Sequence, residues 1–188
     1  MPFDTHTCSL LETFTNNPPL TEDDWYGVWV AILTALFPPV QGYMVSPKRH
    51  LPSDVLEVVK LTSTNPLTLR TVLIVKILNS QHWNTEYGSW PGIETLERKL
   101  NLHANSAFNE TARTKVYWIG VIGSHWRYGE KDDGIDDGQD LQPLIDWHDT
   151  THDQASYDDL QILAGLVGAL AFQGGLTLCQ LRHTVCTV

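Results

Sequence analysis

The chain has 188 residues, and 12 lysines and arginines stand against 22 aspartates and glutamates, which gives a formal net charge of −10. This length predicts one domain that buries a full core without disulfides or metals. The negative charge repels a phosphate backbone, so the composition disfavours nucleic acid as a partner.

The cysteines and the apolar segments indicate the cellular compartment. Cys8, Cys179 and Cys186 lack the C-x-x-C spacing of a zinc or redox motif, so we expect free thiols. The N-terminus shows no secretory signal, and the longest apolar stretch, 160–172, is shorter than the roughly 20 residues of a membrane span. We therefore expect an intracellular protein, cytoplasmic or nuclear, without membrane contact.

Helix signals frame the domain at both ends. Residues 1–20 lack a usable apolar period and are predicted to form an N-terminal arm, before a single domain over 21–175 and a C-terminal tail over 176–188. After Thr21, apolar residues recur at three- and four-residue spacing and predict the first helix over 22–37. The last helix is predicted over 156–172, with an acidic cap at its start.

The middle of the chain alternates strand and helix signals. Strands are predicted over 41–46, 54–61 and 70–78, with a polar turn over 47–53. A crossover helix over 92–108 and a fourth strand over 115–123 follow, and glycines in that strand leave room for backbone or ligand. The apolar character of the second and third strands indicates an α/β domain, with a central mixed sheet of four or five strands flanked by helices.

One charged residue stands out within the predicted sheet. Lys76 lies inside the apolar run 72–78, although a strand covered on both faces rarely carries a charge. Asp54 follows Pro52 at the start of the preceding strand. With the order helix, three strands, crossover helix and strand, these residues resemble the PD-(D/E)xK restriction-endonuclease-like superfamily over about residues 24–128. The chain also resembles, in general texture, a group of small uncharacterised fungal proteins.

The resemblance implies a site that has lost its metal. In that superfamily an aspartate and an acid-x-lysine pair converge on a divalent ion that activates water, and the pair faces one side of its strand. The resemblance places Lys76 at the acid position and Leu78 at the lysine position, and an ammonium there repels a metal ion. Acids on helices, at 22–24 and Glu94, remain an alternative source of ligands.

Asp54 and Lys76 are thus candidate catalytic residues. The alternative for the two is a structural salt bridge across neighbouring strands, in which Lys76 fills the former metal site.

Histidines and aromatic residues gather where strands are expected to end. His82 and His125 are candidate acids or bases. The candidate ligand-binding residues have aromatic, imidazole or guanidinium side chains: Trp83, Tyr87, Trp90, Trp126, Arg127, Tyr128, Trp147 and His148. Because ligands collect at strand ends in open sheets, we expect one pocket to be lined by side chains of two segments: His82, Trp83, Tyr87 and Trp90, and His125, Trp126 and Arg127. The alternative for 125–128 is an edge strand with alternating exposure.

Two further segments contain metal-binding residue types. His148 and His152 stand four apart, but their surroundings favour a hydrogen-bonded loop over a zinc site. The acidic stretch 130–140 lacks the spacing of a calcium-binding EF-hand loop and is expected to be a solvated turn. No metal and no cofactor is therefore predicted.

These observations lead to three hypotheses for the function. The first is a pseudoenzyme with a nuclease-like fold that binds a small molecule or a protein partner through its His- and Trp-rich loops. The second is a metal-independent isomerase or cyclase that uses His82, His125 or His148. The third is a divalent-metal-dependent nuclease with relocated acids around Asp54. Exposed tryptophans are in addition compatible with a homodimer.

Overall fold

A computed structural model describes residue 3 and the ranges 5–19, 21–50, 53–64, 67–83, 91–110, 115–133 and 141–173. The helices are α1 (Thr5–Asn16), α2 (Glu22–Leu36), α3 (Pro91–Glu110) and α4 (Gln154–Gln173), with two short 3-10 helices, η1 (Pro39–Gln41) and η2 (Ser80–His82). The strands are β1 (Tyr43–His50), β2 (Ser53–Thr64), β3 (Leu67–Leu78), β4 (Lys115–Ile122), β5 (His125–Asp132) and β6 (Gln142–Pro143).

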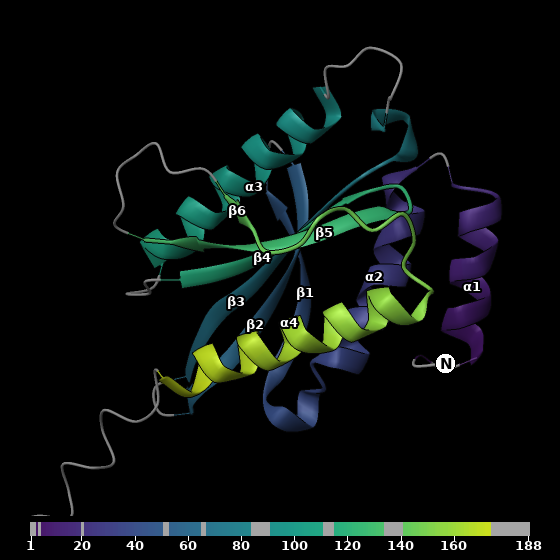
Figure 1. Cartoon of the computed structure of the whole chain (residues 1–188). Helices are drawn as coiled ribbons and strands as arrows, with labels where there is room; N and C mark the ends of the chain where they lie inside the picture. Colours follow the sequence, from purple (N-terminus) through teal and green to yellow (C-terminus); the bar gives the residue numbers. More distant parts are fainter. Residues whose placement is uncertain are drawn as a thin grey trace, which may run out of the picture.

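The strands form one mixed sheet in the order β1-β2-β3-β4-β5-β6 (Figure 1). Neighbouring strands are antiparallel except β3 and β4, which are parallel and are joined by α3. The predicted α/β class, single domain and mixed sheet are confirmed. The described sheet has six strands instead of four or five, because β4 turns into β5 at Gly123, whose φ of 61° suits a tight turn.

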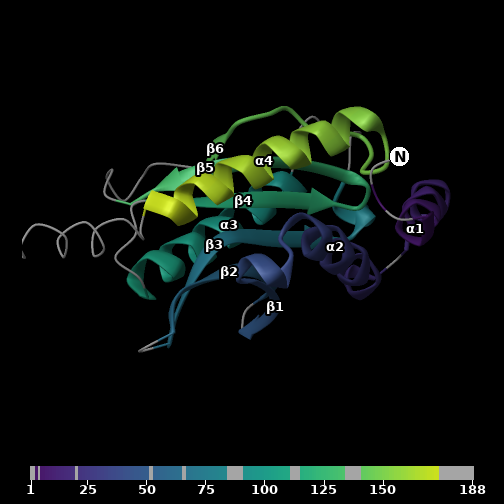
Figure 2. The same cartoon turned by 90° about the horizontal axis from the view of Figure 1, so that it is seen from below.

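Alternating side chains of the sheet contribute to two cores. The core on one face contains α3 and includes Ile74, Leu78, Leu96, Leu100, Trp118 and Ile122. The core on the other face contains residues of α1, α2 and α4 and includes Leu11, Trp25, Trp29, Val75, Ile119, Trp126, Leu160 and Leu163. Figures 1 and 2 show α1 beside α2 at one end of the molecule, while α4 runs along the sheet. The third strand is covered on both faces, as its apolar sequence predicts.

Gly120 of β4 explains how α3 approaches the sheet. A Cβ atom at this position would lie 2.7 Å from Cδ2 of Leu96 and 3.4 Å from Cδ1 of Leu100. The room predicted at Gly120 is thus taken up by side chains of α3.

The prediction of an N-terminal arm without a helix was wrong, because residues Thr5–Asn16 form α1. Thr7 and Leu11 are buried, and the ring of Phe14 lies 5.2 Å from that of Trp25 in an edge-to-face contact. The helix therefore packs through positions 7, 11 and 14. Thr7 interrupts the apolar period of the buried face, and Leu10 is an apolar residue on the exposed face, so the sequence shows no clear helical pattern.

Two predicted boundaries also need correction. The predicted turn over 47–53 is partly strand, because β1 continues to His50 and β2 starts at Ser53. Pro47 does not end β1, since β1 is an edge strand on which a missing N–H is tolerated. The last helix begins at Gln154, where Asp153 accepts a hydrogen bond from the backbone N–H of Ser156 at 2.7 Å. Asp153 is therefore the N-cap, and the helix starts two residues before the predicted position.

The predicted C-terminal tail, 176–188, lies outside the described residues, as do Cys179 and Cys186. Cys8 is a free thiol. Within the described ranges, no helix combines the length and the apolar character that crossing a membrane requires.

The close packing around Gly129 gives a prediction on stability. A Cβ atom there would lie 2.0 Å from the carbonyl oxygen of Gln142 and 2.4 Å from the Trp118 ring. We expect Gly129→Ala to lower the free energy of unfolding by about 1–3 kcal/mol, because backbone and indole must move apart. Gly165→Ala on α4 is the matched control, since a Cβ atom meets nothing within 4 Å there and alanine favours the helix by about 0.5–1 kcal/mol. Urea unfolding measures both changes, and equal effects would contradict the packing described.

Candidate functional site

Lys76 is buried in the middle of the sheet and bound to a helix. Its side chain is 1% exposed, and its Nζ lies 3.3 Å from Oε2 of Glu22, whose own side chain is 31% exposed. Glu22 is the first residue of α2. The ion pair thus joins the start of α2 to the C-terminal half of β3, and it offsets part of the cost of removing the ammonium from water.

The surroundings of Lys76 on β3 contain no second acid at the expected spacing. Ile74 and Leu78, two residues to either side, are both fully buried and belong to the core that contains α3. Asp54 lies in β2 opposite Arg49 of β1, but its side chain is not among those described. The predicted salt bridge between Asp54 and Lys76 therefore stays a prediction, whereas Glu22 is an observed partner of Lys76.

The alternation of β5 divides the predicted pocket between two faces. His125 and Arg127 lie on the α3 side, where they contact Trp83 and Glu97. Trp126 and Tyr128 point the other way into the second core and are 0% and 3% exposed. The expectation that Trp126 lines one pocket with His125 and Arg127 was wrong, since successive residues of a strand face opposite sides. The alternative, a strand with alternating exposure, describes this segment better.

Four of the predicted site residues do come together on the α3 side, and we call Trp83, His125, Arg127 and Trp147 the aromatic cluster. The rings of Trp83 and His125 are stacked, with centroids 3.8 Å apart and planes inclined by 13°. The ring of Trp147 meets that of Trp83 at 5.0 Å and 69°. All four side chains are partly buried, so the cluster borders the α3-side core without being enclosed in it.

Arg127 holds the cluster to α3. Its Nη2 forms an ion pair with Glu97, and its guanidinium carbon lies 4.7 Å from the centroid of the Trp147 ring. Burial lowers the pKa of Arg127, whereas the carboxylates of Glu97 and Asp146 raise it and offset part of this effect. Its Nε is buried and has no hydrogen-bond partner among the described residues. One of the guanidinium donors is therefore left unused in a partly apolar setting.

His125 combines burial with a nearby acid. Its Nε2 lies 3.7 Å from Oδ1 of Asp149, whose side chain is 91% exposed. Burial lowers the pKa of His125 below its ordinary value of 6.5, while Asp149 and a backbone hydrogen bond involving Ile122 act in the opposite direction. The imidazole is therefore mostly neutral at pH 7.

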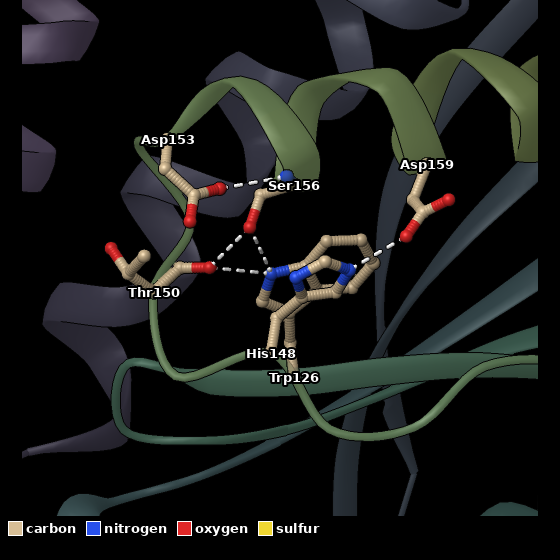
Figure 3. A network of polar contacts seen from close by, with 6 residues as sticks. All are labelled: Trp126, His148, Thr150, Asp153, Ser156 and Asp159. Atoms are coloured by element: carbon tan, nitrogen blue, oxygen red, sulfur yellow. Dashed lines mark hydrogen bonds and ion pairs between the residues drawn. The ribbon is translucent and has the colours of Figure 1, made fainter.

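The other face of β5 carries a polar network that fastens the 144–153 loop (Figure 3). His148 pairs with Trp126 through two backbone hydrogen bonds, stacks on its ring at 4.7 Å, and contacts Asp159 of α4 through Nε2 at 2.8 Å. The indole N–H of Trp126 donates to the carbonyl of Thr150 at 2.9 Å, and the hydroxyl of Ser156 donates to the same carbonyl. His148 and Trp126 thus anchor the loop from which Trp147 reaches the aromatic cluster.

The remaining predicted residues lie elsewhere or outside the described ranges. His82 is exposed at the end of η2, and its backbone carbonyl packs against Gly92 of α3. Tyr87 and Trp90 fall within 84–90, which is not described. His152 forms a hydrogen bond with Thr150. Among the side chains that the structure describes, no three His, Cys, Asp or Glu residues are grouped so that they could hold a metal ion.

Two acids were not identified from the sequence: Glu97, which pairs with Arg127 of the cluster, and Asp159, which contacts His148 of the loop. Glu97 and Asn101 are four apart on α3, and they bind Arg127 and Lys131, which are four apart on β5. The shared spacing is visible in the sequence, since residues four apart share one face of a helix and also one face of a strand. Asp159 carries no such signal.

Comparison of the chain with models of known protein families, with curated proteins and with solved structures finds no match.

The burial of His125 gives a prediction on pH dependence. The unfolded chain takes up a proton near pH 6.5, whereas the folded chain does so at lower pH, so the contribution of His125 to stability is complete above 6.5 and is lost as the pH falls below it. An NMR titration of the imidazole should give a midpoint below 6.5. Asp149→Asn should lower that midpoint further, because the carboxylate favours the charged imidazole. A midpoint above 6.5 would contradict the assigned burial effect.

Proposed function

We propose that the protein is a pseudoenzyme with a PD-(D/E)xK-like fold that has lost metal-dependent cleavage and binds a small molecule or a protein partner through the aromatic cluster. The observation that carries the first half is the ion pair between buried Lys76 and Glu22. A divalent ion beside this ammonium would meet a fixed positive charge, and the carboxylate of Glu22 is already paired with that charge.

The element order supports the resemblance on which this proposal rests. The order α2, β1, β2, β3, α3, β4 follows the sequence of helix, three strands, crossover helix and strand. Asp54 lies near the start of β2, and Lys76 lies near the end of the antiparallel strand β3. The two elements that would carry the site are thus neighbours at one end of the sheet.

The acid-x-lysine pair is incomplete in either possible register on β3. With Lys76 at the acid position, the lysine position holds Leu78. With Lys76 at the lysine position, the acid position holds Ile74, which is fully buried. Neither register supplies a carboxylate from β3, and the hard divalent ions of such sites need oxygen ligands.

The aromatic cluster supports the second half of the proposal. It gathers two indoles, an imidazole and a guanidinium from three segments distant in the sequence, all partly exposed. Binding sites tend to combine aromatic surface with a few placed polar groups. In the sequence, Trp83 directly precedes the segment 84–90, which contains two more of the predicted ligand-binding residues.

Metal binding and cleavage test the loss of nuclease activity. We expect calorimetry with Mg²⁺ or Mn²⁺ to show no binding to a specific site, and we expect no cleavage of single- or double-stranded DNA or RNA with either ion. The reason is that Lys76 places a cation paired with Glu22 at this position and that β3 supplies no carboxylate, whereas a two-acid metal site requires two free carboxylates.

A second candidate, a nuclease with relocated acids, is favoured by the position of Glu22 beside Lys76. It predicts metal-dependent cleavage that is lost in Asp54→Ala and Glu22→Gln but kept in Asp133→Ala, an exposed acid at the end of β5. Cleavage with this pattern would replace the pseudoenzyme proposal. Cleavage that is equal in all three variants would indicate a contaminant.

A further inference from the structure

The planes of Trp83 and Trp147 form a corner at the surface. The two indoles are inclined by 69° with centroids 5.0 Å apart, so a group placed in this corner contacts both rings. His125 covers one face of Trp83 by stacking. The contact is edge-to-face, so the edge of one indole covers part of the face of the other, and the ring faces that remain carry negative electrostatic potential.

The cluster already holds one cation against an aromatic face. The guanidinium of Arg127 lies 4.7 Å from the centroid of the Trp147 ring, within the range of cation–π attraction. That charge is balanced by the ion pair with Glu97. The face of Trp147 is thus oriented to hold a positive group, and the paired Arg127 adds little net positive charge to the cluster.

Two carboxylates of the described residues lie near the cluster. Asp146 is exposed and interacts electrostatically with Arg127. Oδ1 of Asp149 lies 3.7 Å from Nε2 of His125, and the side chain of Asp149 is 91% exposed. The chain as a whole carries −10. An anionic ligand would meet these two carboxylates, whereas a cation would be attracted both by them and by the rings.

We propose that the aromatic cluster binds an alkylated ammonium group, seated against Trp83 and Trp147 with Asp146 and Asp149 at its rim. This inference rests on the proposed function, because it names the ligand chemistry of the same site. The group has two sources with the same chemistry: a small quaternary amine, or a methylated lysine side chain of a protein partner.

NMR on the intact chain tests this inference through its indole N–H resonances. We expect choline and a short peptide with one trimethyllysine to shift the signals of Trp83 and Trp147. The neutral isostere 3,3-dimethyl-1-butanol should bind about tenfold more weakly, because it lacks the charge that the rings and carboxylates attract. Stronger binding of the peptide than of choline identifies a protein source, and the reverse identifies a small molecule.

Variants separate the site from the general charge of the protein. Asp149→Asn should weaken choline binding several-fold, and Asp158→Asn, an exposed acid on α4 that changes the net charge equally, should not. Trp147→Leu should abolish the shift of Trp83, and an unchanged dispersion of the other indole signals shows that this variant folds.

Three outcomes would overturn the inference: equal affinity for the neutral isostere, tighter binding of inorganic phosphate than of choline, or equal loss in the two aspartate variants. These measurements use neither divalent metal nor nucleic acid. A failure here leaves the loss of cleavage standing, and cleavage in the other experiment leaves the cation site standing.

Discussion

The ammonium of Lys76 constrains how the rest of the chain can pack. A cation in a strand that is covered on both faces costs several kcal/mol in lost hydration unless a carboxylate lies beside it. Glu22 is such a carboxylate, and because it is the first residue of α2, the ion pair fixes where that helix begins. One and two turns further on, Trp25 and Trp29 then enter the core beneath the sheet. The ion pair therefore ties the position of α2 to that of Lys76 on β3.

Successive side chains of β5 lie alternately in the aromatic cluster and in the core on the opposite face of the sheet. Its odd-numbered residues, His125 and Arg127, contribute to the partly exposed cluster, while Trp126 and Tyr128 fill the core. The loop that contains Trp147 and His148 repeats this division, since Trp147 joins the cluster and His148 stacks on Trp126. Because His148 is anchored on Trp126, the neighbouring Trp147 is held in the aromatic cluster.

The sequence predicts the elements better than it predicts their partners. Helices α2, α3 and α4 and strand β3 follow from apolar periodicity, because their buried faces are continuous. Helix α1 was missed because Thr7 interrupts its buried row. The partner of Lys76 is 54 residues away, and no local pattern encodes which acid the fold brings to it. The division of 125–128 between two faces, by contrast, follows from the strand period and can be read from the sequence alone.

Helix α3 packs over β4 and binds the aromatic cluster. Lys76, Gly120 and Arg127 lie opposite one another on β3, β4 and β5. Above this row, Leu96 fills the space over Gly120, and the next residue, Glu97, binds Arg127. A change in the position of Arg127 would therefore act on α3 through Glu97, and α3 could shift only by disturbing the packing over Gly120. The packing of Leu96 over Gly120 therefore helps to hold the neighbouring Glu97 beside Arg127.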